Sequence, residues 1–75
     1  MIWKVERSTN TPDGVRYRLA FVPAGERRPQ VLYDNHPPKG HHRHIVGTQS
    51  AYRFETVTKL LRDFEASIEE YLEGH

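Results

Sequence analysis

Residues 57–72 read VTKLLRDFEASIEEYL, and this stretch decides the fold. Its apolar side chains recur at spacings of three, four and seven residues, which places them along one face of a helix. These apolar residues are Val57, Leu60, Leu61, Phe64, Ile68, Tyr71 and Leu72. Thr56 can cap the first turn and Gly74 can end the last one, so we predict one C-terminal amphipathic helix that packs on a sheet.

Two strands are predicted in the N-terminal part of the chain. Every second residue of 15–21 is apolar, which is the period of a half-buried strand. Residues 2–8 also alternate, and this pattern places Trp3 and Val5 together in the core. Between the two strands, residues 12–14 read PDG, a sequence typical of a hairpin turn.

The remaining strand signals are shorter. Residues 30–33 predict a third strand, residues 42–46 a brief fourth strand, and residues 52–54 an extended segment that leads into the helix. Two prolines and a glycine make residues 34–40 a loop. The sequence therefore predicts one α+β domain over residues 1–75, a small antiparallel sheet of three to four strands with one C-terminal helix packed on one face.

Composition and charge limit the kinds of function. The chain has 75 residues and no cysteine, which excludes a thiol nucleophile, a disulfide framework and a zinc–thiolate site. Its longest apolar run is residues 19–22 and its beginning has no apolar signal-peptide core, so we expect a cytoplasmic protein away from membranes. Lys and Arg outnumber Asp and Glu by nine to four in residues 1–53, but are outnumbered two to six in residues 54–75. The basic part is expected to meet an anion.

Four of the five histidines lie within residues 36–44. Imidazole both accepts and donates a proton near neutral pH, which suits cleavage of a phosphodiester by general acid and base catalysis. In an extended segment His42 and His44 share a face, with Cα atoms roughly 7 Å apart. One histidine would deprotonate a ribose 2′-hydroxyl and the other would protonate the leaving oxygen. The candidate catalytic residues are His42, His44, Arg43 and Asp34.

Cationic and polar side chains around this pair are candidates for binding the substrate. Lys39, Arg43 or Arg53 would stabilise negative charge on the transition state. The candidate substrate-binding residues are Lys39, His41, His36, Asn35, Arg53 and Arg18. Together they predict a metal-independent ribonuclease that needs no cofactor.

Other interpretations of the same residues remain open. His42 and His44, joined by His36 or Asp34, would also make a three-ligand set for zinc or manganese. A third interpretation is a solvated loop that is rich in histidine without a functional role, with Asp34 and Asn35 acting as turn formers. A basic strand face that carries Arg18 would also suit a binding module for nucleic acid or protein without catalysis.

Four short motifs support a family assignment. They are Tyr33-Asp34-Asn35, Lys39-Gly40-x-His42-Arg43-His44, Tyr52-Arg53-Phe54 and Leu60-Leu61-x-Asp63-Phe64. Together they resemble the small prokaryotic TumE-like proteins, which are regarded as toxins of toxin–antitoxin pairs. The resemblance implies a growth-inhibiting toxin with an RNA-directed activity, encoded beside an antitoxin that often carries a helix-turn-helix domain. So small a domain also makes a homodimer plausible.

Overall fold

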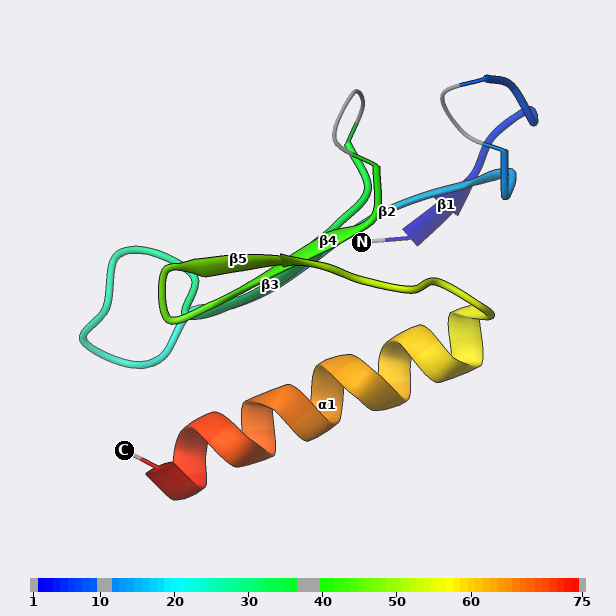
Figure 1. Cartoon of the computed structure of the whole chain (residues 1–75). Helices are drawn as coiled ribbons and strands as arrows, with labels where there is room; N and C mark the ends of the chain where they lie inside the picture. The colour runs from blue at the N-terminus through cyan, green and yellow to red at the C-terminus, as the bar shows by residue number, and fades with distance from the viewer. Residues whose placement is uncertain (1, 10–11, 37–39, 75) are drawn as a thin grey trace.

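The computed structural model describes residues 2–9, 12–36 and 40–74. Five strands form one antiparallel sheet in chain order, followed by one helix (Figure 1). The elements are β1 (Ile2–Lys4), β2 (Val15–Phe21), β3 (Val31–Asp34), β4 (His42–Ile45), β5 (Thr48–Ala51) and α1 (Val57–Gly74). The predicted α+β architecture with a C-terminal helix is confirmed, but the sheet has five strands rather than three to four.

The additional strand is β5, which the sequence did not predict. Its residues TQSA are all exposed and lack apolar alternation, so no period of two marks them as a strand. β5 forms because Val46 and Gly47 reverse the chain, with φ angles of 47° and 81°. Two successive positive φ angles are typical of the type I′ turn in tight hairpins. Valine rarely adopts a positive φ, so this turn is difficult to predict from the sequence.

The two faces of the sheet have different environments. In β2 and β3 the alternate residues Val15, Tyr17, Leu19, Val31 and Tyr33 are buried, on the side of the sheet that faces α1. Strand pairing carries this alternation across the sheet, because paired residues in neighbouring strands point to the same side. In the part of the chain that is described, no helix or strand covers the opposite side (Figure 1).

We call this uncovered side the open face. Its strand residues follow from the register of the sheet. They are Trp3, Arg16, Arg18, Ala20, Leu32, Asp34, His42, His44, Gln49 and Ala51. Most of these side chains are polar or charged, so the open face is suited to contact with water or with a polar ligand.

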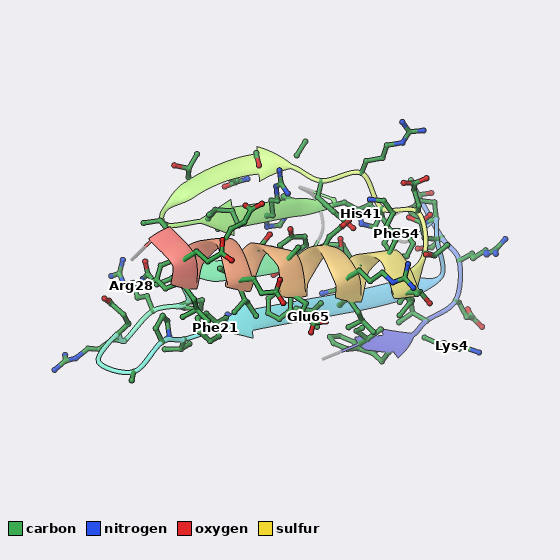
Figure 2. The ribbon with its side chains drawn as sticks, turned by 90° about the horizontal axis from the view of Figure 1, so that it is seen from below. Lys4, Phe21, Arg28, His41, Phe54 and Glu65 are labelled. Atoms are coloured by element: carbon green, nitrogen blue, oxygen red, sulfur yellow. The ribbon has the colours of Figure 1, made fainter. Side chains whose placement is uncertain are left out.

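The core lies between α1 and the helix-facing side of the sheet. Its buried members are Tyr17, Leu19, Val31, Tyr33, Tyr52 and Leu60. Aromatic rings make the central contacts, with the Tyr33 ring centroid 5.0 Å from that of Tyr52 and 5.7 Å from that of Phe64. Figure 2 shows α1 lying along the strands on this side, with His41 and Phe54 beside the beginning of the helix.

The helix begins and packs largely as predicted. The backbone N–H of Lys59 donates to Oγ1 of Thr56 over 3.0 Å, so Thr56 is the N-cap. The apolar stripe is narrower than predicted, because Val57, Leu61 and Leu72 remain exposed. Among the described residues, α1 offers no segment apolar and long enough to span a membrane.

Trp3 occupies a different position from the one predicted. Ile2 pairs with Tyr17 and packs against the core, whereas Trp3 pairs with Arg16 on the open face. Trp3 is 41% exposed, so the prediction that it packs in the core with Val5 is wrong. The period of two holds in β1, but Ile2 rather than Trp3 is the residue that faces the helix.

The helix packing can be tested with two neighbouring leucines. Leu60 is 0% exposed and Leu61 is 45% exposed. We expect Leu60→Ala to lower the free energy of unfolding by about 2–5 kcal/mol, because it leaves a cavity in the core. Leu61→Ala should cost about 1 kcal/mol or less. Urea unfolding followed by circular dichroism measures both, and equal losses would contradict the packing described here.

Candidate functional site

His42 and His44 lie side by side on the open face. Their ring centroids are 5.3 Å apart and the rings meet edge to face. His42 is 7% exposed, and its Nδ1 lies 2.8 Å from the carbonyl oxygen of Gly40. A carbonyl oxygen only accepts hydrogen bonds, so Nδ1 donates and carries a proton. In the neutral ring the unprotonated nitrogen of His42 is therefore Nε2, which has the lone pair that a base needs.

A cation and a carboxylate stand in line with this pair. Arg18 of β2 pairs with Asp34 of β3, and Asp34 pairs with His42 of β4. Directly opposed residues of antiparallel strands have Cβ atoms about 5 Å apart, so these side chains are neighbours. The open face thus brings two imidazoles, a guanidinium and a carboxylate together, which are groups suited to proton transfer and to holding an anion.

Asp34 also shapes the chain just after β3. Its Oδ1 accepts a hydrogen bond from the backbone N–H of His36 over 2.6 Å. This is the local turn that aspartate commonly makes with its own backbone two residues on. The carboxylate therefore fixes the end of β3 beside the histidine pair.

Arg43 lies on the other side of the sheet from the two histidines. It pairs with Tyr33, and its Nη1 donates to the Tyr33 hydroxyl over 3.3 Å. A strand alternates its side chains, so the residue between His42 and His44 must point away from both. Arg53 follows β5, and it lines a cleft on the same helix-facing side as Arg43. The structure therefore does not bring these two arginines together with the histidine pair.

Asn35 is engaged within the fold. It is 4% exposed, and its Oδ1 accepts from the backbone N–H of Tyr17 over 2.9 Å. Its Nδ2 donates to the carbonyl oxygen of Val15 over 2.7 Å. Both ends of the side-chain amide thus extend the pairing of β2 and β3, which accounts for an asparagine at this position.

His41 lies apart from the other histidines, beside the beginning of α1. Its Nε2 donates to Oδ2 of Asp13 over 2.7 Å, so in the neutral ring Nδ1 accepts from the Tyr17 hydroxyl over 2.8 Å. Burial, followed by the charge of Asp34, raises the pKa of Tyr17, which keeps the proton that it donates. The His41 ring is also stacked on Phe54 at 4.9 Å (Figure 2). With both nitrogens occupied, His41 ties the turn before β2 to the helix side.

His36 borders the open face, and its Nδ1 accepts from Nη2 of Arg16 over 2.8 Å. The remaining predicted contact, Lys39, lies outside the described residues. Across the described part of the chain, no three histidine, aspartate or glutamate side chains come together as a group that could hold a metal ion.

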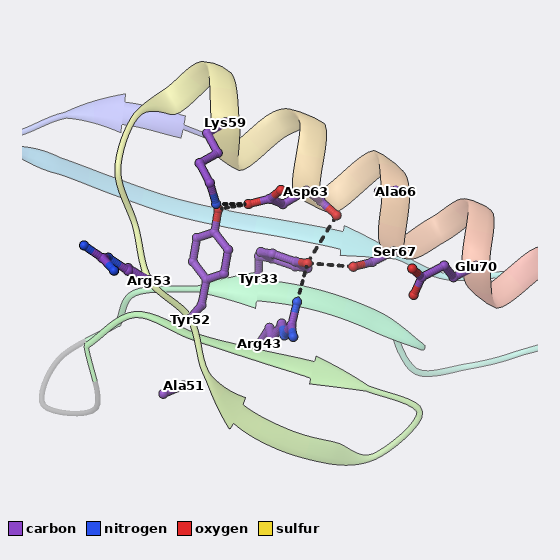
Figure 3. A pocket seen from close by; sticks show the side chains of 10 residues that line it. All are labelled: Tyr33, Arg43, Ala51, Tyr52, Arg53, Lys59, Asp63, Ala66, Ser67 and Glu70. Carbon is purple, nitrogen blue, oxygen red and sulfur yellow. Dashed lines mark hydrogen bonds and ion pairs between the residues drawn. The ribbon is translucent and has the colours of Figure 1, made fainter.

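A polar cleft of about 450 Å³ lies between α1 and the β4–β5 side of the sheet (Figure 3). At its centre the Tyr33 hydroxyl donates to the carbonyl oxygen of Asp63 over 3.2 Å and lies 2.6 Å from the Ser67 hydroxyl. Ser67 is not among the site residues predicted from the sequence. The signal for it was present, because a serine interrupts the apolar stripe of the helix at a position that faces the sheet.

Asp63 holds a second group of polar side chains in the cleft together by hydrogen bonds. Its Oδ2 accepts from Lys59 Nζ over 2.7 Å and from the Tyr52 hydroxyl over 2.6 Å. The hydrogen bond from Lys59, and then that from Tyr52, holds the pKa of Asp63 below its usual value. Burial and the same hydrogen bond raise the pKa of Tyr52. These groups satisfy one another, and Arg53 points away from them (Figure 3).

A model of the family described as "Toxin TumE" matches residues 1–72 of the chain. No curated protein and no solved structure matches it. The family match includes the open face, the histidine-rich segment and most of α1, so it covers every described residue discussed above except the end of the helix.

The lowered pKa of the Asp63 carboxylate in the cleft predicts that the stability of the protein depends on pH. A pKa held low in the folded state stabilises the protein above the unfolded pKa of about 4, and this contribution is lost as the pH falls through the folded value. We therefore expect Asp63→Asn to be less stable than the wild type at pH 7, with the difference shrinking below about pH 4. Urea unfolding of both proteins at several pH values measures this difference in stability. Glu65→Gln, which removes an exposed carboxylate from the same helix, is the control, and a pH-independent effect of Asp63→Asn would contradict this account.

Proposed function

We propose that this chain, which belongs to the TumE toxin family, inhibits growth by cleaving RNA on the open face of its sheet. The family makes it a toxin that acts opposite an antitoxin. To this family role the proposal adds RNA as the target. It also adds His42 and His44 as the acid and base. It is supported by one observation above all, the contact of two imidazoles on a sheet face that no described helix or strand covers.

The hydrogen bond of His42 suggests how the two roles are divided. Its Nδ1 is committed to Gly40, so Nε2 accepts the proton of a ribose 2′-hydroxyl. The 2′-oxygen then attacks the adjacent phosphorus, and the bond from phosphorus to the 5′-oxygen breaks. His44, in its protonated form, donates a proton to that leaving oxygen. The products are a 2′,3′-cyclic phosphate and a free 5′-hydroxyl.

The negative charge of the transition state at the phosphate must be stabilised by a cation on the same side of the sheet as His42 and His44. Lys39, Arg43 and Arg53 were the sequence-based candidates, but Lys39 lies outside the described residues and the two arginines lie on the helix-facing side. Arg18 lies on the open face in line with His42 and is exposed. We therefore assign stabilisation of the negative transition state to Arg18. Asp34 acts as a positioning residue, because it fixes the turn that follows β3.

Binding without cleavage is the second candidate function. Arg16 and Arg18 on one face would attract nucleic-acid phosphates whether or not a bond is broken. An antitoxin with a helix-turn-helix domain, which the motif resemblance implies, would act as the partner in either case. Cleavage products separate the two functions.

The test is a cleavage assay on purified protein, combined with a growth assay on cells that express it. In cells, we expect the wild type to stop growth. In the cleavage assay, the purified wild type should leave RNA fragments with 2′,3′-cyclic phosphate ends in the presence of EDTA. His42→Ala and His44→Ala should each reduce cleavage by about 100-fold or more while remaining folded. His75→Ala is the matched control, because it removes a histidine outside residues 36–44.

The pH dependence gives a second measure of the same mechanism. A mechanism that needs one neutral imidazole as the base and one protonated imidazole as the acid makes the cleavage rate rise and then fall as the pH increases. Full activity in both alanine variants would overturn the proposal. RNA that is bound but left intact by wild type would favour the binding function instead.

A further inference from the structure

Trp3 is the single tryptophan of the chain, and it lies on the open face. It is 41% exposed on the surface. Its cross-strand neighbour Arg16 places the guanidinium carbon 5.8 Å from the centroid of the indole ring. This cation–π contact places a cation against the ring, and the residue still keeps two fifths of its surface exposed to a further partner.

Arg16 links Trp3 to the loop that carries the histidines. Its Nη2 donates to Nδ1 of His36 over 2.8 Å, so Trp3, Arg16 and His36 form a line across the first strands. A parallel line two residues further along β2 contains Arg18 and, on β4, His42. Strands are spaced about 4.8 Å apart, so Trp3 on β1 and His42 on β4 are separated by roughly 14 Å across the sheet.

The chemistry of this surface favours a nucleic acid over a protein. Exposed tryptophan and arginine also occur at the centres of protein interfaces. The open face that carries Trp3 and Arg16, however, also carries Arg18, His42 and His44, and this set of groups can meet successive phosphates of a nucleic-acid strand. An aromatic platform beside cations is the usual means of binding single-stranded RNA, since every base has a π face that can stack.

We propose that Trp3, held by Arg16, is a stacking site for a nucleobase of the single-stranded RNA that crosses the open face. This inference rests on the proposed function, since the reacting phosphate of that RNA would lie at His42 and His44. The base on Trp3 belongs to a nucleotide away from the scissile bond. Trp3 therefore determines substrate affinity rather than the chemical step.

Trp3 is the single tryptophan, so the intrinsic fluorescence of the protein reports directly on binding at this residue. Intrinsic fluorescence is titrated with a single-stranded DNA oligonucleotide, which lacks the 2′-hydroxyl and remains uncut, and with an abasic oligonucleotide of equal length. We expect saturable quenching by the first and little by the second, because the abasic strand has the same phosphates but no base to stack. Equal responses to both oligonucleotides, or none to either, would overturn the stacking site.

Variants of Trp3 provide a second measurement in the RNA cleavage assay. We expect Trp3→Ala to raise KM by roughly 10-fold with kcat little changed, and Trp3→Phe to recover part of the loss. Cleavage by wild type with an unchanged KM in Trp3→Ala would refute the stacking site and leave the proposed function standing. Base-dependent quenching without any cleavage would support the stacking site and refute the catalytic proposal.

The fluorescence titration has a third possible outcome, in which Trp3 contacts a protein instead of a nucleic acid. If the antitoxin quenches Trp3 but neither oligonucleotide does, the open face around Trp3 is a protein interface and the inference fails.

Discussion

The packing of one helix against one face of the sheet is the constraint on which the rest of this structure depends. Leu60 and Tyr33 are fully buried where α1 meets the strands. One helix covers only one side, so strand alternation sends every second side chain to a face that no described element covers. Polar and charged residues occupy that second face, and His42 and His44 are among them.

Strong periodicity allowed much of the fold to be predicted. Residues 15–21 and the helix after Thr56 have long, regular apolar patterns, and the structure confirms both. Short elements were less predictable. β1 has three residues, too few to fix which side Trp3 takes, and β5 depends on a valine in a turn conformation that valine rarely adopts.

The candidate site shows a similar division between local and long-range information. Local alternation was sufficient to place His42 and His44 together. The neighbours that the sheet supplies, such as Arg18, depend on the register between β2, β3 and β4, which one strand alone does not contain. The structure also separates residues that are adjacent in the chain, because His41 joins Asp13 and Tyr17 while Arg43 joins Tyr33.

The central claim is that RNA is bound on the open face rather than in the cleft under α1. Nuclear magnetic resonance of the side chains, with a DNA oligonucleotide added stepwise, tests it most directly. The account predicts that the imidazole signals of His42 and His44 and the indole signal of Trp3 shift, while those of His41 stay in place. Shifts confined to Arg43, which lines the cleft, and to His41, which lies beside the beginning of α1, would contradict it.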